Sequence, residues 1–152
     1  LKRNGTFTLT EEIILSSDFD IAILTPRNHK DIVEKLILWH GESARAALVE
    51  LRKFIRVPDT VEHAIYENHF IARGDIYRQY VSDCLIPAIE FMASKMDVFG
   101  ADSGYVSKKR NPQEIAEYQA KTGRKDWPIA PFILERLFCI WANKKGFKYI
   151  NL

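Results

Sequence analysis

Short apolar runs typical of buried strands alternate along this chain with longer runs that have helical spacing. Residues 19–25 are mostly apolar, partly β-branched and closed by Pro26, a pattern typical of a buried strand. Apolar positions then recur with helical spacing over 30–39 and, after Gly41, over 42–55. Strands that alternate with helices indicate an α/β fold, so we expect helices packed on a small mixed sheet.

The alternation continues to the end of the chain. We expect a second strand at 64–72, ending before Arg73 and Gly74. A loop should follow Phe99 and extend to Arg110. The remaining expected elements are a polar helix over 113–121, a helix over 132–144 and a short strand over 147–150.

A long helix is expected between these elements, over 75–96. Pro87 lies inside it and should kink or break it, because proline lacks the N–H that the helix needs and its ring clashes with the preceding turn. The residues expected to face the core are Ile76, Tyr80, Leu85, Ile89 and Met92.

Length and charge favour one domain and argue against nucleic acid as a partner. At 152 residues, the chain suits a single domain over 1–152. Its 22 basic and 20 acidic residues give a formal net charge of +2, which creates no strong field toward a polyanion. The basic run at 108–110 is interpreted as a solvated loop.

The two cysteines and the absence of a long apolar run suggest a cytoplasmic protein. Cys84 and Cys139 each lie in an apolar helical pattern without the spacing of a zinc site, so we expect them to be free and buried. A reducing compartment follows from this expectation. No run approaches the ~20 apolar residues of a transmembrane helix, although peripheral attachment to an inner membrane stays open.

Three stretches of the chain share their order and spacing with a known family. They are residues 18–26, residues 68–73 with the aromatic residues that follow at Tyr77 and Tyr80, and residues 132–141. Together they resemble a family of glycosyltransferases encoded in bacterial capsule and lipopolysaccharide gene clusters. The last stretch is the most specific, because it places a Glu-Arg pair ahead of an aromatic residue at helical spacing.

The resemblance implies a GT-A-like fold that transfers a sugar from a nucleotide sugar to a glycan or lipid-linked acceptor. The family's nucleotide-binding segment has no counterpart among these stretches. We therefore expect the chain to be the C-terminal, acceptor-side part of a transferase. An N-terminal half or a partner chain would then supply the donor site.

The Glu-Arg pair of the third stretch carries the main catalytic hypothesis. Sugar transfer needs a base for the acceptor hydroxyl and a cation for the departing diphosphate. Glu135 is the candidate base, or a residue that orients the base, and Arg136 is a candidate phosphate ligand. The alternative is a structural ion pair that holds the helix onto the sheet.

Three residues of the second stretch are candidate substrate ligands. Asn68 and His69 are expected in a strand, where their side chains face opposite ways and one of them can reach a sugar hydroxyl. Arg73 follows that strand, where ligands of open α/β sheets gather. The alternatives are a hydrogen-bonded structural histidine and an ordinary surface arginine.

Asp18 and Asp20 form a DxD sequence of the kind that binds the donor's metal in many such transferases. Carboxylate oxygens suit Mn²⁺ or Mg²⁺. This pair precedes its strand, however, whereas the usual motif follows one. The alternative interpretation is that both residues simply begin the strand.

A role other than catalysis also fits the sequence. The chain could be a non-catalytic α/β interaction module that docks through exposed aromatic residues of the long helix. A nucleic-acid-binding domain would rest only on the basic run at 108–110 and is not favoured.

Overall fold

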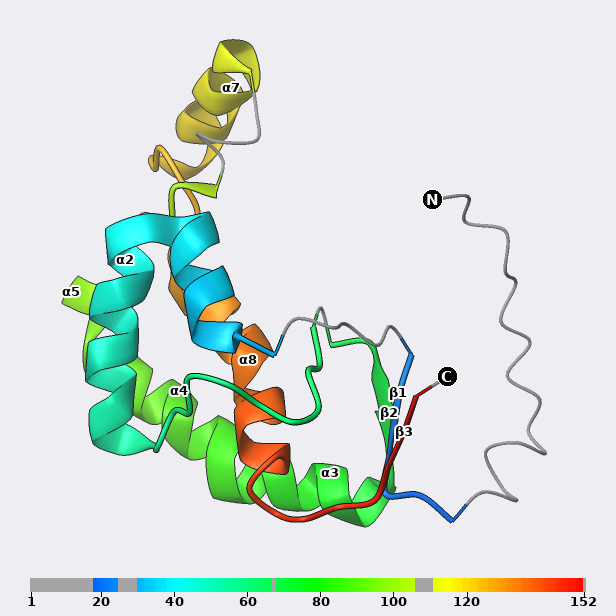
Figure 1. Cartoon of the computed structure of the whole chain (residues 1–152). Helices are drawn as coiled ribbons and strands as arrows, with labels where there is room; N and C mark the ends of the chain where they lie inside the picture. The colour runs from blue at the N-terminus through cyan, green and yellow to red at the C-terminus, as the bar shows by residue number, and fades with distance from the viewer. Residues whose placement is uncertain (1–17, 25–29, 67, 106–110, 152) are drawn as a thin grey trace, which may run out of the picture.

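A three-stranded mixed sheet lies at one edge of a group of helices in the computed structural model, which describes residues 18–24, 30–66, 68–105 and 111–151 (Figure 1). Helices α2, α3, α4 and α8 pack together beside the sheet, and α7 projects away from them. The expected α/β architecture with a small mixed sheet is thereby confirmed. The basic run at 108–110 lies outside the described residues.

The central strand of the sheet is β1 (Ile21–Ile23), which is fully buried. It pairs antiparallel with β2 (Phe70–Ala72) and parallel with β3 (Tyr149–Asn151). The sheet therefore joins segments from near the start, the middle and the end of the described chain.

The expected strand at 64–72 is wrong in its first part. In the described part of this range, Phe70–Ala72 alone is a strand, and Asn68 has a left-handed φ of 55° that interrupts an extended backbone. Asparagine tolerates this conformation better than most residues, because its short polar side chain can bond locally. The chain turns at Asn68 and enters the sheet only afterwards.

Helix α2 (Ile32–Phe54) contains the two helices expected from the sequence, joined at Gly41. Gly41 has φ 64° and ψ −141°, a conformation that only glycine adopts without strain. The buried side chains of α2 are Ile32, Leu36, His40, Ala44, Ala47, Leu48 and Leu51.

The long helix after β2 consists of α3 (Gly74–Tyr80), the π-helical turn η1 (Val81–Leu85) and α4 (Ile86–Ala93). In the π turn the Ile86 N–H donates to the Val81 carbonyl, five residues back. Pro87 follows at once, in the first turn of α4, where its missing N–H is least costly. The expected irregularity is confirmed, and it takes the form of a widened turn ahead of the proline.

The π turn changes which residues face the core. The buried residues are Ile76, Tyr80, Cys84, Ala88 and Met92, each four positions after the last. Leu85 is half-buried and packs against the core, whereas Ile89 is 46% exposed, so the expectation was wrong at Ile89. A regular helix rotates about 40° at every four-residue step, and the wider turn removes most of this drift.

The described residues that follow contain the helices α5 (Met96–Phe99), α7 (Pro112–Thr122) and α8 (Ala130–Ala142). Helix α7 starts at a capping box in which Asn111 and Glu114 each accept the other's backbone N–H. It ends at left-handed Gly123 and has no buried residue. The limits of α7 therefore follow from its capping residues, and none of its side chains is buried in the core.

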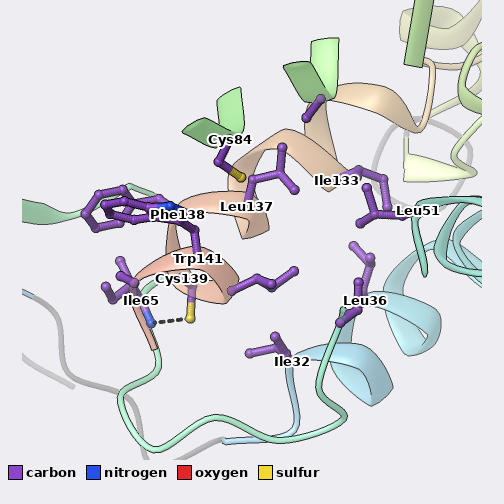
Figure 2. Close-up of a cluster of buried hydrophobic side chains, with 14 of the residues drawn as sticks. Ile32, Leu36, Leu51, Ile65, Cys84, Ile133, Leu137, Phe138, Cys139 and Trp141 are labelled. Carbon is purple, nitrogen blue, oxygen red and sulfur yellow. Dashed lines mark hydrogen bonds between the residues drawn. The ribbon is translucent and has the colours of Figure 1, made fainter. Parts of the chain in front are cut away.

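Helix α8 runs through the centre of the hydrophobic core (Figure 2). Leu137 and Ile133 pack between α2 and the long helix, and Phe138 stacks on Phe70 of β2 with ring centroids 3.8 Å apart. Cys84 and Cys139 are free and buried, as expected. The Cys139 Sγ accepts a hydrogen bond from the Ile65 N–H at 3.4 Å.

Candidate functional site

Glu135 and Arg136 form an ion pair on α8, with 2.5 Å between Glu135 Oε1 and Arg136 Nη1. The pair is partly buried, since the side chain of Arg136 is 13% exposed and that of Glu135 is 23% exposed. Both side chains have been withdrawn from bulk water, and Glu135 keeps the larger opening to solvent. The arrangement suits a carboxylate that a guanidinium holds in one orientation.

The guanidinium of Arg136 also lies over the Tyr66 ring, 4.6 Å from its centroid. This cation–π contact fixes the second side of the group. Its Nε is buried and has no hydrogen-bond partner among the described residues. Arg136 is therefore held between Glu135 and Tyr66.

Asn68 and His69 lie beside Tyr66, in the turn that leads into β2. The His69 N–H donates to the Tyr66 carbonyl at 3.2 Å, and the His69 carbonyl accepts from Leu24 after β1. Both residues are exposed. The expectation that they alternate within a strand was wrong, because the turn at Asn68 precedes the sheet.

Arg73 lies at the opposite end of β2 and is engaged by two carboxylates. It contacts Asp75 at 2.9 Å and Asp20 at 3.3 Å. Its backbone N–H also donates to the Asp20 carbonyl. Arg73 thus joins the end of β2 to the start of β1, where the antiparallel pairing brings them together.

Asp20 also bonds the residue just before β3, in addition to its contacts with Arg73 at the end of β2. Its Oδ2 accepts the Lys148 N–H at 2.9 Å, just before β3. Asp18 pairs with the Lys148 ammonium, and this hydrogen bond is the main cause that lowers the pKa of the Asp18 carboxyl. Both carboxylates of the DxD sequence therefore contact cations.

The described residues contain no group of three or more histidine, cysteine or acidic side chains that could hold a metal. A metal at Asp18 and Asp20 would have to displace Lys148 and Arg73, or draw ligands from other parts of the chain. The contacts of this pair explain its place in the fold without a metal.

The predicted site residues fall into two groups at the two ends of β2. Glu135 and Arg136 lie near Tyr66 and the turn of Asn68 and His69. Asp18, Asp20 and Arg73 lie at the other end, about 10 Å away along three strand residues. Each group contains a partly open carboxylate, since the side chain of Glu135 is 23% exposed and that of Asp20 is 22% exposed.

A buried polar cluster that the sequence interpretation missed lies at the joint of α2. It consists of His40, Ser103 and Asp126, which are all at most 7% exposed. Ser103 Oγ donates to Asp126 at 3.1 Å, and His40 Nδ1 donates to the Ser103 carbonyl at 3.3 Å. The histidine does not contact the hydroxyl, so this is not the arrangement of a nucleophile and its base.

Aromatic rings surround this cluster. The ring centroids of His40 and Phe132 are 4.0 Å apart, and Tyr105 stacks on Trp127 with ring centroids 5.6 Å apart. Asp126 also accepts the Trp127 N–H at 2.7 Å. The cluster fixes the loops before α8, and the only sequence signal for it was the run of polar and aromatic residues at 124–128.

The chain matches no family model, no curated protein and no solved structure in comparisons with known proteins. Within the described residues, none of the helices is both long enough and apolar enough to cross a membrane.

Proposed function

We propose that this chain is the acceptor-side part of a glycosyltransferase that takes its sugar from a nucleotide donor. One observation carries the proposal: the three stretches that resemble such enzymes pack into one unit. The first two pair as β1 and β2, Phe70 of the second stacks on Phe138 of the third, and Arg136 lies over Tyr66, just before the second.

Glu135 is the group assigned to the chemistry. The acceptor hydroxyl attacks the anomeric carbon, its proton passes to the carboxylate, and the bond to the nucleoside diphosphate breaks. Arg136 orients this carboxylate, and Asn68 and His69 offer hydrogen bonds to sugar hydroxyls at the adjoining turn. We assign the donor's diphosphate, with any Mn²⁺ or Mg²⁺, to residues other than Glu135, Arg136, Asn68 and His69.

The test uses the native polypeptide, after its intact mass has been determined. It is titrated with a panel of nucleotide sugars, with and without Mn²⁺, and assayed for transfer to a glycan acceptor. Glu135→Gln should lower kcat by at least about 100-fold, the usual range for a general base, with little change in donor affinity.

Glu90→Gln is the matched control. Glu90 is exposed on α4, and its side chain makes no ion pair among the described residues. This variant should keep full activity. Loss of folding in Glu135→Gln, seen by circular dichroism, would instead indicate the structural ion pair, and absence of nucleotide-sugar binding would contradict the transferase proposal.

An interaction module is the second candidate. The long helix exposes three apolar side chains to solvent, Tyr77 at 45%, Ile86 at 50% and Ile89 at 46%. Such residues are common at contacts between proteins. This candidate gains support if the native polypeptide binds no nucleotide sugar.

A further inference from the structure

An open cavity of about 520 Å³ lies between the segment that follows α2 and the residues just past α8. Its polar wall consists of Arg56, Thr60, Glu62, Asn143 and Lys144. We propose that this cavity binds the phosphate group of a small hydroxylated molecule. The proposal does not depend on sugar transfer at Glu135.

Two cations line the cavity without an acidic partner. Neither Arg56 nor Lys144 forms a salt bridge with any residue in the described part of the chain. The neighbouring Lys145, by contrast, pairs with Asp83 at 3.9 Å and lies over the Trp141 ring. The two cavity cations are thus available for an anion.

Burial and like charge act against the ammonium of Lys144. Burial is the larger cause that lowers its pKa, and the charge of Arg56 lowers it further. A bound anion would remove the repulsion and stabilise both charged forms. The cavity therefore favours a negatively charged ligand over a neutral one.

Asn143 forms the wall of the cavity and is not expected to bind the ligand. Its Nδ2 donates to the His63 carbonyl at 2.8 Å and to the Cys139 carbonyl at 2.9 Å, and its Oδ1 accepts the His63 N–H. These bonds tie the segment after α2 to the end of α8. They hold together the two segments that carry Arg56 and Lys144, the two cations of the cavity.

The balance of charges indicates a monoester and not a longer polyanion. A phosphate monoester carries a charge near −2 at neutral pH, which Arg56 and Lys144 together match. Glu62 on the same wall repels additional negative groups and can accept a hydrogen bond from a ligand hydroxyl. The volume is within the usual range of small-molecule sites, about 300–1,000 Å³.

The alternative is that both cations only compensate the C-terminal ends of helices. Arg56 and Lys144 each lie two residues beyond a helix, after Phe54 of α2 and Ala142 of α8. Cations at such ends are favourable without any ligand. A structural role of this kind predicts an effect on stability that does not depend on phosphate.

The experiment is a titration of the full chain with inorganic phosphate and with glycerol phosphate at constant ionic strength, followed by ¹H–¹⁵N NMR. Saturable shifts are expected at the amides of Thr60, Val61 and Lys144. The double variant Arg56→Gln/Lys144→Gln should weaken binding at least about tenfold, since it removes two charge-assisted contacts. Arg78→Gln/Lys95→Gln removes two exposed cations elsewhere and should leave binding unchanged.

Vesicles containing phosphatidic acid, with phosphatidylcholine vesicles as the neutral control, form a second arm. Sedimentation with the acidic vesicles alone, lost in the Arg56/Lys144 variant, assigns the phosphate to a lipid headgroup. Saturable binding of glycerol phosphate without sedimentation assigns it to a soluble ester. Scattered, unsaturable shifts that the Arg56/Lys144 variant retains would overturn the proposal, as would a variant that loses only thermal stability.

Discussion

At the scale of single residues, the two thiols of the core show how burial alters the chemistry of a side chain. Burial raises the pKa of Cys84 to about 11, and it also raises the pKa of Cys139. Neither thiol is an activated nucleophile, because the thiolate is the reactive form. The sequence interpretation of both cysteines as small core residues is confirmed by their burial.

The raised pKa of Cys84 predicts a loss of stability at alkaline pH. The unfolded chain releases the thiol proton near pH 9, while the folded chain keeps it until about pH 11. Ionisation then favours the unfolded state between these values, by at most about 1.4 kcal/mol per pH unit. In urea unfolding from pH 8 to 10.5, Cys84→Ala should show a shallower fall of the unfolding free energy than the wild type.

Buried groups with raised pKa values elsewhere act in the same direction, so the variant should retain part of the dependence. Burial also raises the pKa values of Tyr80, Tyr149 and Cys139. The lost packing of Cys84 should add a constant offset at every pH. Parallel curves for the variant and the wild type would contradict the prediction.

At the scale of elements, the π turn η1 determines which face of the long helix reaches the core. It acts as one residue added to a helix, and this residue keeps Cys84, Ala88 and Met92 in line with Tyr80. Pro87 follows the turn and fits there because the wider ring relieves the clash with the preceding carbonyl. Removing the added residue should therefore be tolerated only if the proline is removed too.

We predict that deletion of Ser82 combined with Pro87→Ala gives a regular helix that folds cooperatively, with a melting temperature close to that of the wild type. Ser82 is exposed, and its hydroxyl bonds only locally, to Gln79 and Asp83. Deletion of Ser82 alone should lower the free energy of unfolding by about 3 kcal/mol, because it leaves Pro87 in the interior of a regular helix. Thermal unfolding followed by circular dichroism compares the two.

Deletion of Ala46 from α2 is the control. Ala46 is also exposed, but α2 has no π turn there, so the deletion should rotate Ala47, Leu48 and Leu51 away from the core by about 100°. This variant should not fold cooperatively. Equal tolerance of both deletions would show that the register of these helices is unimportant.

The elements also show where prediction from the sequence succeeds and where it fails. Gly41, Pro112 and Gly123 act through their own backbone preferences, so the joint of α2 and the limits of α7 could be predicted. The π turn and the turn at Asn68 could not, because the surrounding packing selects each of them. The Glu135–Arg136 pair could be identified from the sequence, while its contact with Tyr66 depends on the tertiary fold.

At the scale of the whole molecule, one carboxylate joins three distant segments. Asp20 precedes β1, bonds the backbone before β3 through Lys148, and contacts Arg73 after β2. Among the described residues Asp18, two positions earlier, pairs with the Lys148 ammonium alone and is 90% exposed. The two aspartates of the DxD sequence therefore differ sharply in what their removal should do.

Asp20→Ala should lower the free energy of unfolding by about 1–2 kcal/mol, because it leaves the Lys148 N–H without its acceptor and removes one of the two carboxylates that contact Arg73, which keeps Asp75. Asp18→Ala should change it by less than about 0.5 kcal/mol, as expected for an exposed ion pair. Thermal melts with and without Mn²⁺ separate this structural role from the metal hypothesis. If Mn²⁺ stabilises the wild type and both substitutions abolish that gain, then the DxD pair binds metal; if the loss in Asp20→Ala is the same with and without Mn²⁺, then the carboxylate holds the three strands together.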